Sequence, residues 1–173
     1  MRKDAKDASV NAFHALSWCL CLVSVVLIAA GCRKHAVASS SMAPTIMRGE
    51  EVTVDYTAYK VSAPARWDVI VFVHPWVTNT LWAMRVVALS GETVSSSATG
   101  IEVNGKPLLR PPGITNVNYQ SLVQLRHSGG VPSPFVVPKD SYFVLGDNST
   151  NANDSRYWGA VPPTNIRGRV LNK

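Results

Sequence analysis

The stretch RWDVIVFVHPWVTNTLWAMRVVALSGE, residues 66–92, decides the fold class because it contains two clear strand-like runs. The first run, WDVIVFV, ends at His74 and Pro75, and the second, LWAMRVVAL, ends at a Ser-Gly-Glu turn. Short apolar runs bounded by turn residues are typical of buried β-strands. We therefore predict two buried strands in this stretch.

Further short apolar runs lie on both sides of it, separated by Gly, Pro, Asn or Ser. Residues 100–108, GIEVNGKPL, also carry the Asn-Gly pair that favours a two-residue hairpin turn. No segment after residue 36 has the spacing of an amphipathic helix. Many short strands with frequent turn residues predict a mainly β domain over residues 36–173. The expected strands lie within residues 50–59, 67–73, 81–89, 100–108, 134–138, 141–148 and 165–171.

The stretch from Arg110 to Pro134 interrupts this pattern, since it is rich in Pro, Gly, Asn and Ser. Such a composition is typical of loops. We expect a long surface excursion there.

The N-terminal part of the chain has a different composition. Residues 8–31 contain no Lys, Arg, Asp or Glu, and their densest apolar part is about as long as the shortest membrane spans. We predict a short cytoplasmic N-terminus over residues 1–10 and a transmembrane anchor over residues 11–31. Two alternatives stay open: a lipoprotein signal that ends before Cys32, and a cleaved signal peptide.

The cysteine content and the charge exclude several classes of function. The three cysteines lie in or beside the apolar segment, so neither a disulfide framework nor a metal cluster is expected in the β domain. The net charge is +6, but the basic residues are scattered and form no basic–aromatic stripe, which argues against nucleic-acid binding. Proximity to anionic lipid headgroups accounts for the charge equally well, as does an ordinary solvated surface.

The segment HAVASSSMAPTIMRGE, residues 35–50, places three serines directly before Met42, Ala43 and Pro44. Pro44 fixes its own φ and favours an extended Ala43. Met42 can fill the apolar floor of the domain or contact the membrane surface. Such an arrangement holds Ser41 rigidly, as a nucleophile requires. Taken alone, however, a serine run after an apolar segment is also compatible with a simple linker.

The order of several motifs distinguishes these two interpretations. The pattern Ser-x-Ser-Met-x-Pro-Thr at residues 39–45 resembles the nucleophile box of type I signal peptidases. Five further blocks resemble that family in the same order: RGEEVTVD (48–55), RWDVIVF (66–72), RVVALSGETV (85–94), VNGKPL (103–108) and YFVLGDNSTNANDSRYWGAVPPTNIRGRV (142–170).

The resemblance implies a β-rich catalytic domain on the extracytoplasmic side of the bacterial inner membrane, held there by a single-pass helix. Its implied partners are signal peptides or preproteins and membrane lipid, without nucleic acid, cofactor or metal. Family members attack the peptide carbonyl with a serine and use a lysine as general base. By position, Ser41 is the nucleophile and Ser39 donates a hydroxyl to the oxyanion, while Ser40 replaces a glycine.

Two departures from the family pattern concern the base. The lysine position is Met84, and the serine that would orient the lysine is Ala152. A thioether is only a weak acceptor and does not titrate as an amine does. Neither the other lysines after the span nor His74 or His127 match a base position.

The sequence therefore leaves two functions open. One is an impaired serine endopeptidase of signal peptides, and the other is a non-catalytic homologue that binds peptides, assists assembly or serves as a partner of an active paralogue. An engineered or miscopied chain is a third interpretation, which a change at two positions disfavours. The resemblance assigns a supporting charged network to Arg85, Asp147, Asp154 and Arg156, and a substrate cleft to Ala38, Met42, Trp82 and Ala83.

Overall fold

The computed structural model describes residues 31–77, 79–97, 100–110, 112–114, 117, 119, 130–171 and 173. Contacts divide the chain into two units, Met1–Cys32 and Arg33–Lys173. The predicted N-terminus (1–10) and anchor (11–31) lie outside the described residues, except for Gly31. Within the described part, no helix is long and apolar enough to cross a membrane.

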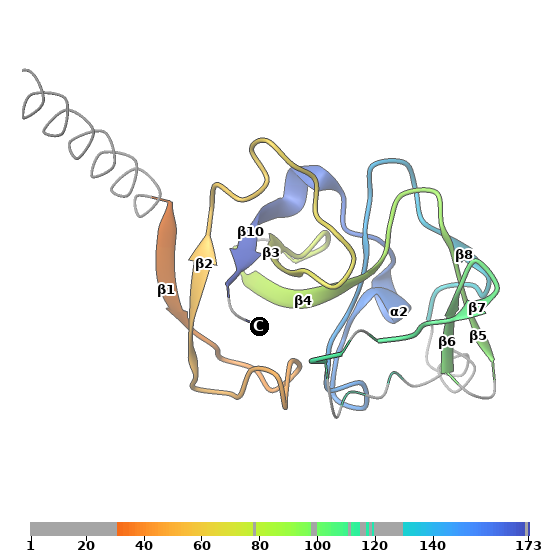
Figure 1. Cartoon of the computed structure of the whole chain (residues 1–173), viewed down its shortest axis with the longest axis horizontal. Helices are drawn as coiled ribbons and strands as arrows, with labels where there is room; N and C mark the ends of the chain where they lie inside the picture. Colours follow the sequence, from red (N-terminus) through yellow and green to blue (C-terminus); the bar gives the residue numbers. More distant parts are fainter. Residues whose placement is uncertain are drawn as a thin grey trace, which may run out of the picture. The chain divides into compact units, whose positions relative to one another are not determined.

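The second unit is built from two antiparallel sheets, so the predicted mainly β fold is confirmed. The larger sheet has the order β1-β2-β10-β3-β4-β9, with β10 between β2 and β3 (Figure 1). The smaller sheet has the order β7-β6-β5-β8. The strands of the larger sheet are β1 (Cys32–Ala36), β2 (Glu51–Asp55), β3 (Val69–Val73), β4 (Leu81–Ala88), β9 (Phe143–Leu145) and β10 (Ile166–Val170). Those of the smaller sheet are β5 (Thr93–Ser97), β6 (Gly100–Val103), β7 (Lys106–Pro107) and β8 (Phe135–Val136).

The two runs that decided the fold class form β3 and β4, which pair from Val69↔Arg85 to Val73↔Leu81. Both strands are buried on two faces because an apolar cluster packs on each side of the sheet. On one face Ile70 lies opposite Met84, and on the other Val71 lies opposite Ala83. This alternation decides which of the β4 residues face the serine segment.

The predicted hairpin turn is also confirmed. Asn104 and Gly105 both have positive φ, 52° and 71°, and they connect β6 to β7. Positive φ at both central residues is the geometry that an Asn-Gly pair adopts at low steric cost.

Three features differ from the expectation. Strands β1 and β5 were not predicted, because neither carries a long apolar run. A short helix, α2 (Ser155–Trp158), and a 3-10 turn, η2 (Pro163–Asn165), follow β9. The prediction of a surface excursion is wrong at Val117 and Tyr119, which are buried in the cluster around β5 and β6.

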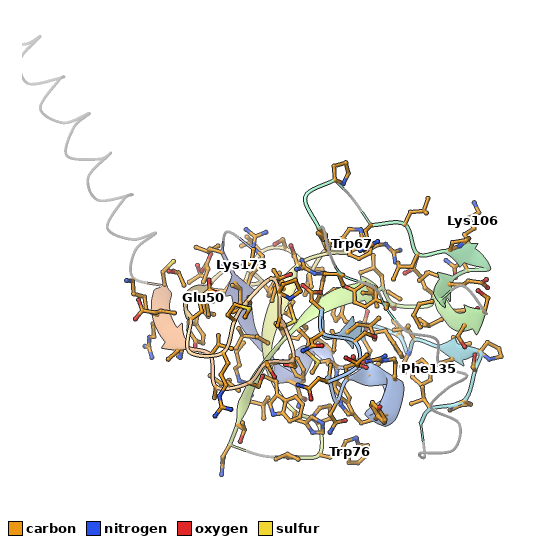
Figure 2. All side chains as sticks on the ribbon, turned by 90° about the horizontal axis from the view of Figure 1, so that it is seen from below. Glu50, Trp67, Trp76, Lys106, Phe135 and Lys173 are labelled. Carbon is orange, nitrogen blue, oxygen red and sulfur yellow. The ribbon has the colours of Figure 1, made fainter. Side chains whose placement is uncertain are left out.

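The C-terminal residues contact the large sheet through an ion pair and a backbone hydrogen bond. Lys173 forms an ion pair with Glu50 (Figure 2), directly before β2. Leu171 donates its backbone N–H to Thr53, 2.9 Å away. The C-terminal end of the chain is thus attached to β2 and to the residue before it.

Candidate active site

The serine segment begins after β1 and is anchored by Met42. Met42 is 1% exposed and packs with Ile46, Val52 and Val54. Its carbonyl accepts the N–H of Ile46 at 2.9 Å, which closes a turn. Ser39 Oγ and Ser41 Oγ lie 2.9 Å apart, within hydrogen-bonding distance. The burial of Met42 in this cluster confirms the expectation that it fills an apolar floor.

The C-terminal motif holds the serines from the other side. Asn148 donates its backbone N–H to the carbonyl of Ser41 (2.9 Å) and its side-chain amide to the carbonyl of Ser40 (3.0 Å). Asn151 donates its side-chain amide to Ser40 Oγ at 2.8 Å. These three bonds fix the backbone of the serine segment relative to β9.

Gly146 allows this close approach. A methyl group on its Cα would lie 2.6 Å from the carbonyl oxygen of Ser41 and 2.4 Å from Cβ of Ala152. Real side chains do not tolerate such contacts, so only glycine fits. Both Ala152 and the Ser41 backbone therefore lie against the Gly146 Cα.

A cavity of about 500 Å³ opens beside the serines. All four residues expected in the substrate cleft line it, namely Ala38, Met42, Trp82 and Ala83, together with Ser39, Ser40 and Ser41. Valines of β2 and β3 complete its apolar wall, and Asn151 and Asn153 contribute amides. Among its described lining residues there is no carboxylate, lysine or arginine, so the cavity suits an apolar chain with a polar group near the serines.

Met84 does not line this cavity. Its side chain is fully buried in the cluster on the opposite face of β4, where it packs with Ile70, Phe72 and Val144. Ala83, which precedes it, lies on the cavity side. The predicted base position is thus in an apolar environment, which suits a thioether and would lower the pKa of an amine.

A buried ion pair joins β4 to the C-terminal motif. Arg85 contacts Asp147 through Nε (2.9 Å) and Nη2 (2.6 Å), and both side chains are almost fully buried. Thr45 and Tyr119 donate their hydroxyls to the same carboxylate, at 2.5 and 2.9 Å. Burial opposes the charge of Arg85, yet the hydrogen bond and charge of Asp147 raise its pKa overall. The network connects Thr45 of the serine segment, Arg85 of β4 and Tyr119.

Asp154 and Arg156 form a second buried pair, with Nε 2.7 Å from Oδ1. Asp154 also accepts the backbone N–H of Gly146 at 3.0 Å and caps the first turn of α2. Burial raises the pKa of Asp154, and its hydrogen bond to Arg156 opposes that shift. Arg156 further donates to the hydroxyl and carbonyl of Ser149, at 2.8 and 2.7 Å. This pair therefore supports the turn that carries Asn148 and Asn151.

Sequence reasoning missed His35, the one residue with a titratable ring among the described residues that line the cavity. Its Nε2 lies 2.7 Å from the hydroxyl of Tyr56. His74 instead lies between Trp82 and Trp158, and its Nδ1 accepts the backbone N–H groups of Trp76 and Val77. His127 lies outside the described residues, and the described lysines are all exposed.

Comparison with known proteins agrees with the motif order. A family model described as signal peptidase, peptidase S26, matches residues 10–172. The chain is 35% identical over 143 residues to the signal peptidase I of Leptolyngbya laminosa, covering 78% of this chain and 64% of that protein. It is 33% identical over 163 residues to the probable signal peptidase I-2 of a Synechocystis strain, covering 87% and 68%. A crystal structure of a signal peptidase I from Enterococcus faecalis V583 is 32% identical, with a TM-score of 0.50 and coverage of 65% of this chain and 99% of that one.

Proposed function

The chain belongs to the S26 signal peptidase family, and from that membership we propose that it binds signal peptides of exported proteins and cleaves them slowly, if at all. One observation carries the proposal. A hydrogen-bonded pair of serines opens into an apolar cavity, while a fully buried methionine occupies the position of the base.

The serine side of the site supports binding and attack. Ser41 is the proposed nucleophile, and Ser39 with the Ser41 backbone N–H stabilises the oxyanion. The cavity beside them suits the small and aliphatic side chains of a signal peptide, because alanines and valines line it. The cleft roles of Ala38, Met42, Trp82 and Ala83 are part of this proposal.

The base side of the site limits the rate. Met84 carries no titrating group, and Ala152 offers no hydroxyl that could orient one. An enzyme of the serine triad type that lacks its base retains about 10³–10⁴-fold acceleration over water, from its oxyanion donors and substrate binding. We expect residual activity of this kind.

The burial of Met84 favours a second candidate, a non-catalytic homologue. Replacing a buried amine by a thioether removes the cost of desolvating that amine, which stabilises the fold at the expense of catalysis. Such a protein would hold peptides in the cavity and act as an assembly factor or as a partner of an active paralogue.

We further propose that residues 11–31 anchor the chain in the bacterial inner membrane. The proposed N-terminus, residues 1–10, then lies in the cytoplasm, and the domain over residues 36–173 lies on the extracytoplasmic side. The absence of charged residues from 8 to 31 supports this topology.

In the deciding experiment, the purified full chain is incubated with a preprotein that carries an Ala-x-Ala site, and cleavage of the preprotein is measured. We expect no brisk cleavage, and any slow cleavage should disappear in Ser41→Ala. Peptide binding measured by calorimetry should survive in both proteins. Brisk cleavage that depends on Ser41 would contradict the impaired mechanism, and the lack of any binding would contradict both candidates.

A further inference from the structure

The polar end of the serine cavity holds more hydrogen-bond donors than its own contacts use. Ser39 and Ser41 share one hydrogen bond, so one of their two hydroxyl protons is left over. Ser40 Oγ accepts from Asn151 at 2.8 Å, which leaves the Ser40 proton free to donate. Among the described residues, none accepts the backbone N–H of Ser41. Three donors are therefore available at one end of the cavity.

The groups that would compete for these donors are lacking. The described lining of the cavity contains no Asp or Glu side chain. The nearby carboxylates of Asp147 and Asp154 are buried and already bonded to Arg85 and Arg156. The three donors thus face a site without negative charge, in a chain whose net charge is +6.

The number of donors separates two kinds of ligand. A peptide carbonyl has one oxygen with two lone pairs and no charge, whereas a carboxylate has two oxygens with about four acceptor positions. Hydrogen bonds to an ionised acceptor are about twice as strong as neutral ones. A free C-terminal carboxylate uses three donors more completely than an internal peptide bond does.

Ser40 makes this chain different from its family pattern, in which glycine occupies the position. Its hydroxyl is held by Asn151 and its carbonyl by Asn148, so the side chain is fixed where both Ser40 and Asn151 line the cavity. The added hydroxyl contributes nothing to the missing base, because it neither titrates nor replaces Met84. Because Ser40 lines the cavity and its Oγ accepts from Asn151, its own proton can be donated to a ligand.

We propose that the serine cavity is a binding site for the free C-terminal carboxylate of an apolar peptide that ends in small residues, the form in which a signal peptide is released by cleavage. This inference rests on the proposed peptide-binding function and names its ligand. The carboxylate accepts from Ser40, from the Ser39–Ser41 pair and from the Ser41 backbone N–H. The apolar body of the peptide lies along the alanine and valine wall. No bond is made or broken.

The test uses the full chain and three synthetic peptides measured by calorimetry. All share an apolar sequence that ends in Ala-Leu-Ala; one has a free carboxylate, one a C-terminal amide, and one continues beyond the last alanine. We expect the free acid to bind about tenfold or more tightly than the other two, since charge-assisted bonds replace neutral ones. Equal binding of acid and amide would overturn the inference and leave the proposed function intact. No binding of any peptide would overturn both.

Two variants locate the effect. Asn151→Asp preserves the side-chain shape beside Ser40 but adds a negative charge, so it should abolish or reverse the preference for the acid while amide binding stays within about threefold. Asn104→Asp adds the same charge at the β6–β7 turn, outside the cavity, and should leave the preference unchanged. Ser40→Ala should reduce the preference, with Ser62→Ala as its matched control. A preference that survives Asn151→Asp in folded protein would overturn the proposed position of the carboxylate.

Discussion

Placing a lysine at residue 84 is the most direct test of the proposed loss of the general base. The change is Met84→Lys together with Ala152→Ser. Met84 is 0% exposed to solvent and packs in an apolar cluster, so an introduced amine would be buried with Ile70 and Phe72. Ala152 lies against Gly146 next to the Ser41 backbone. The family resemblance assigns position 152 the hydroxyl that orients the amine, which is why the two changes are combined.

The cost in stability follows from burial. Lysine has an ordinary pKa of about 10.4, and a depression of about two units corresponds to about 2.7 kcal/mol. Because the folded state then binds the proton less readily than the unfolded state, the loss is complete below the depressed pKa. It disappears as the pH rises through about 10.4. Urea unfolding at several pH values measures this dependence.

The gain in rate should be about 10²–10⁴-fold, the usual contribution of a positioned general base. Met84→Lys alone should give less, because an amine without a hydroxyl partner has no fixed orientation toward Ser41. The assay is cleavage of an Ala-x-Ala preprotein, with Ser41→Ala added to the double variant as the control. A folded double variant that is no faster than the parent would refute the assignment of residues 84 and 152.

Three further outcomes are expected. In intact spheroplasts, external protease should degrade residues 50–173, and protection of this region would contradict the proposed topology. Asp147→Asn should lower the free energy of unfolding in urea by about 3–5 kcal/mol, because it leaves Arg85 buried without its partner. The control Lys34→Gln, at an exposed ion pair, should change stability little. Equal effects of the two variants would contradict the buried network. Burial and the charge of Asp147 raise the pKa of Tyr119 above its ordinary value of about 10. The contribution of Tyr119 to the free energy of unfolding should therefore be fully present below about pH 10 and decrease as the phenol of the unfolded chain ionises above it. Tyr119→Phe should flatten this alkaline decline, and an unchanged decline would show that other groups cause it.

The fold and much of the site were predictable because their signals are local. The apolar runs of β3 and β4 and the Asn-Gly turn of the hairpin each lie within a few residues. That positions 84 and 152 carry methionine and alanine, and so neither an amine nor a hydroxyl, could also be read directly from the sequence. The strands β1 and β5 escaped prediction because neither shows a long apolar run.

The arrangement of the serine cavity could only be decided by the tertiary structure. The bonds from Asn148 and Asn151 to Ser40 join residues 108 and 111 positions apart, and no local pattern specifies such contacts. They arise because β9 lies beside β4 and Gly146 allows the C-terminal motif to approach the Ser41 backbone. Tyr119 likewise reaches Asp147 from a stretch whose composition indicated an exposed loop. The sequence by itself determined which chemical groups this protein has and lacks; the packing of the sheets decided which of them meet, because distant residues come together only when burial and hydrogen bonding are satisfied across the whole domain.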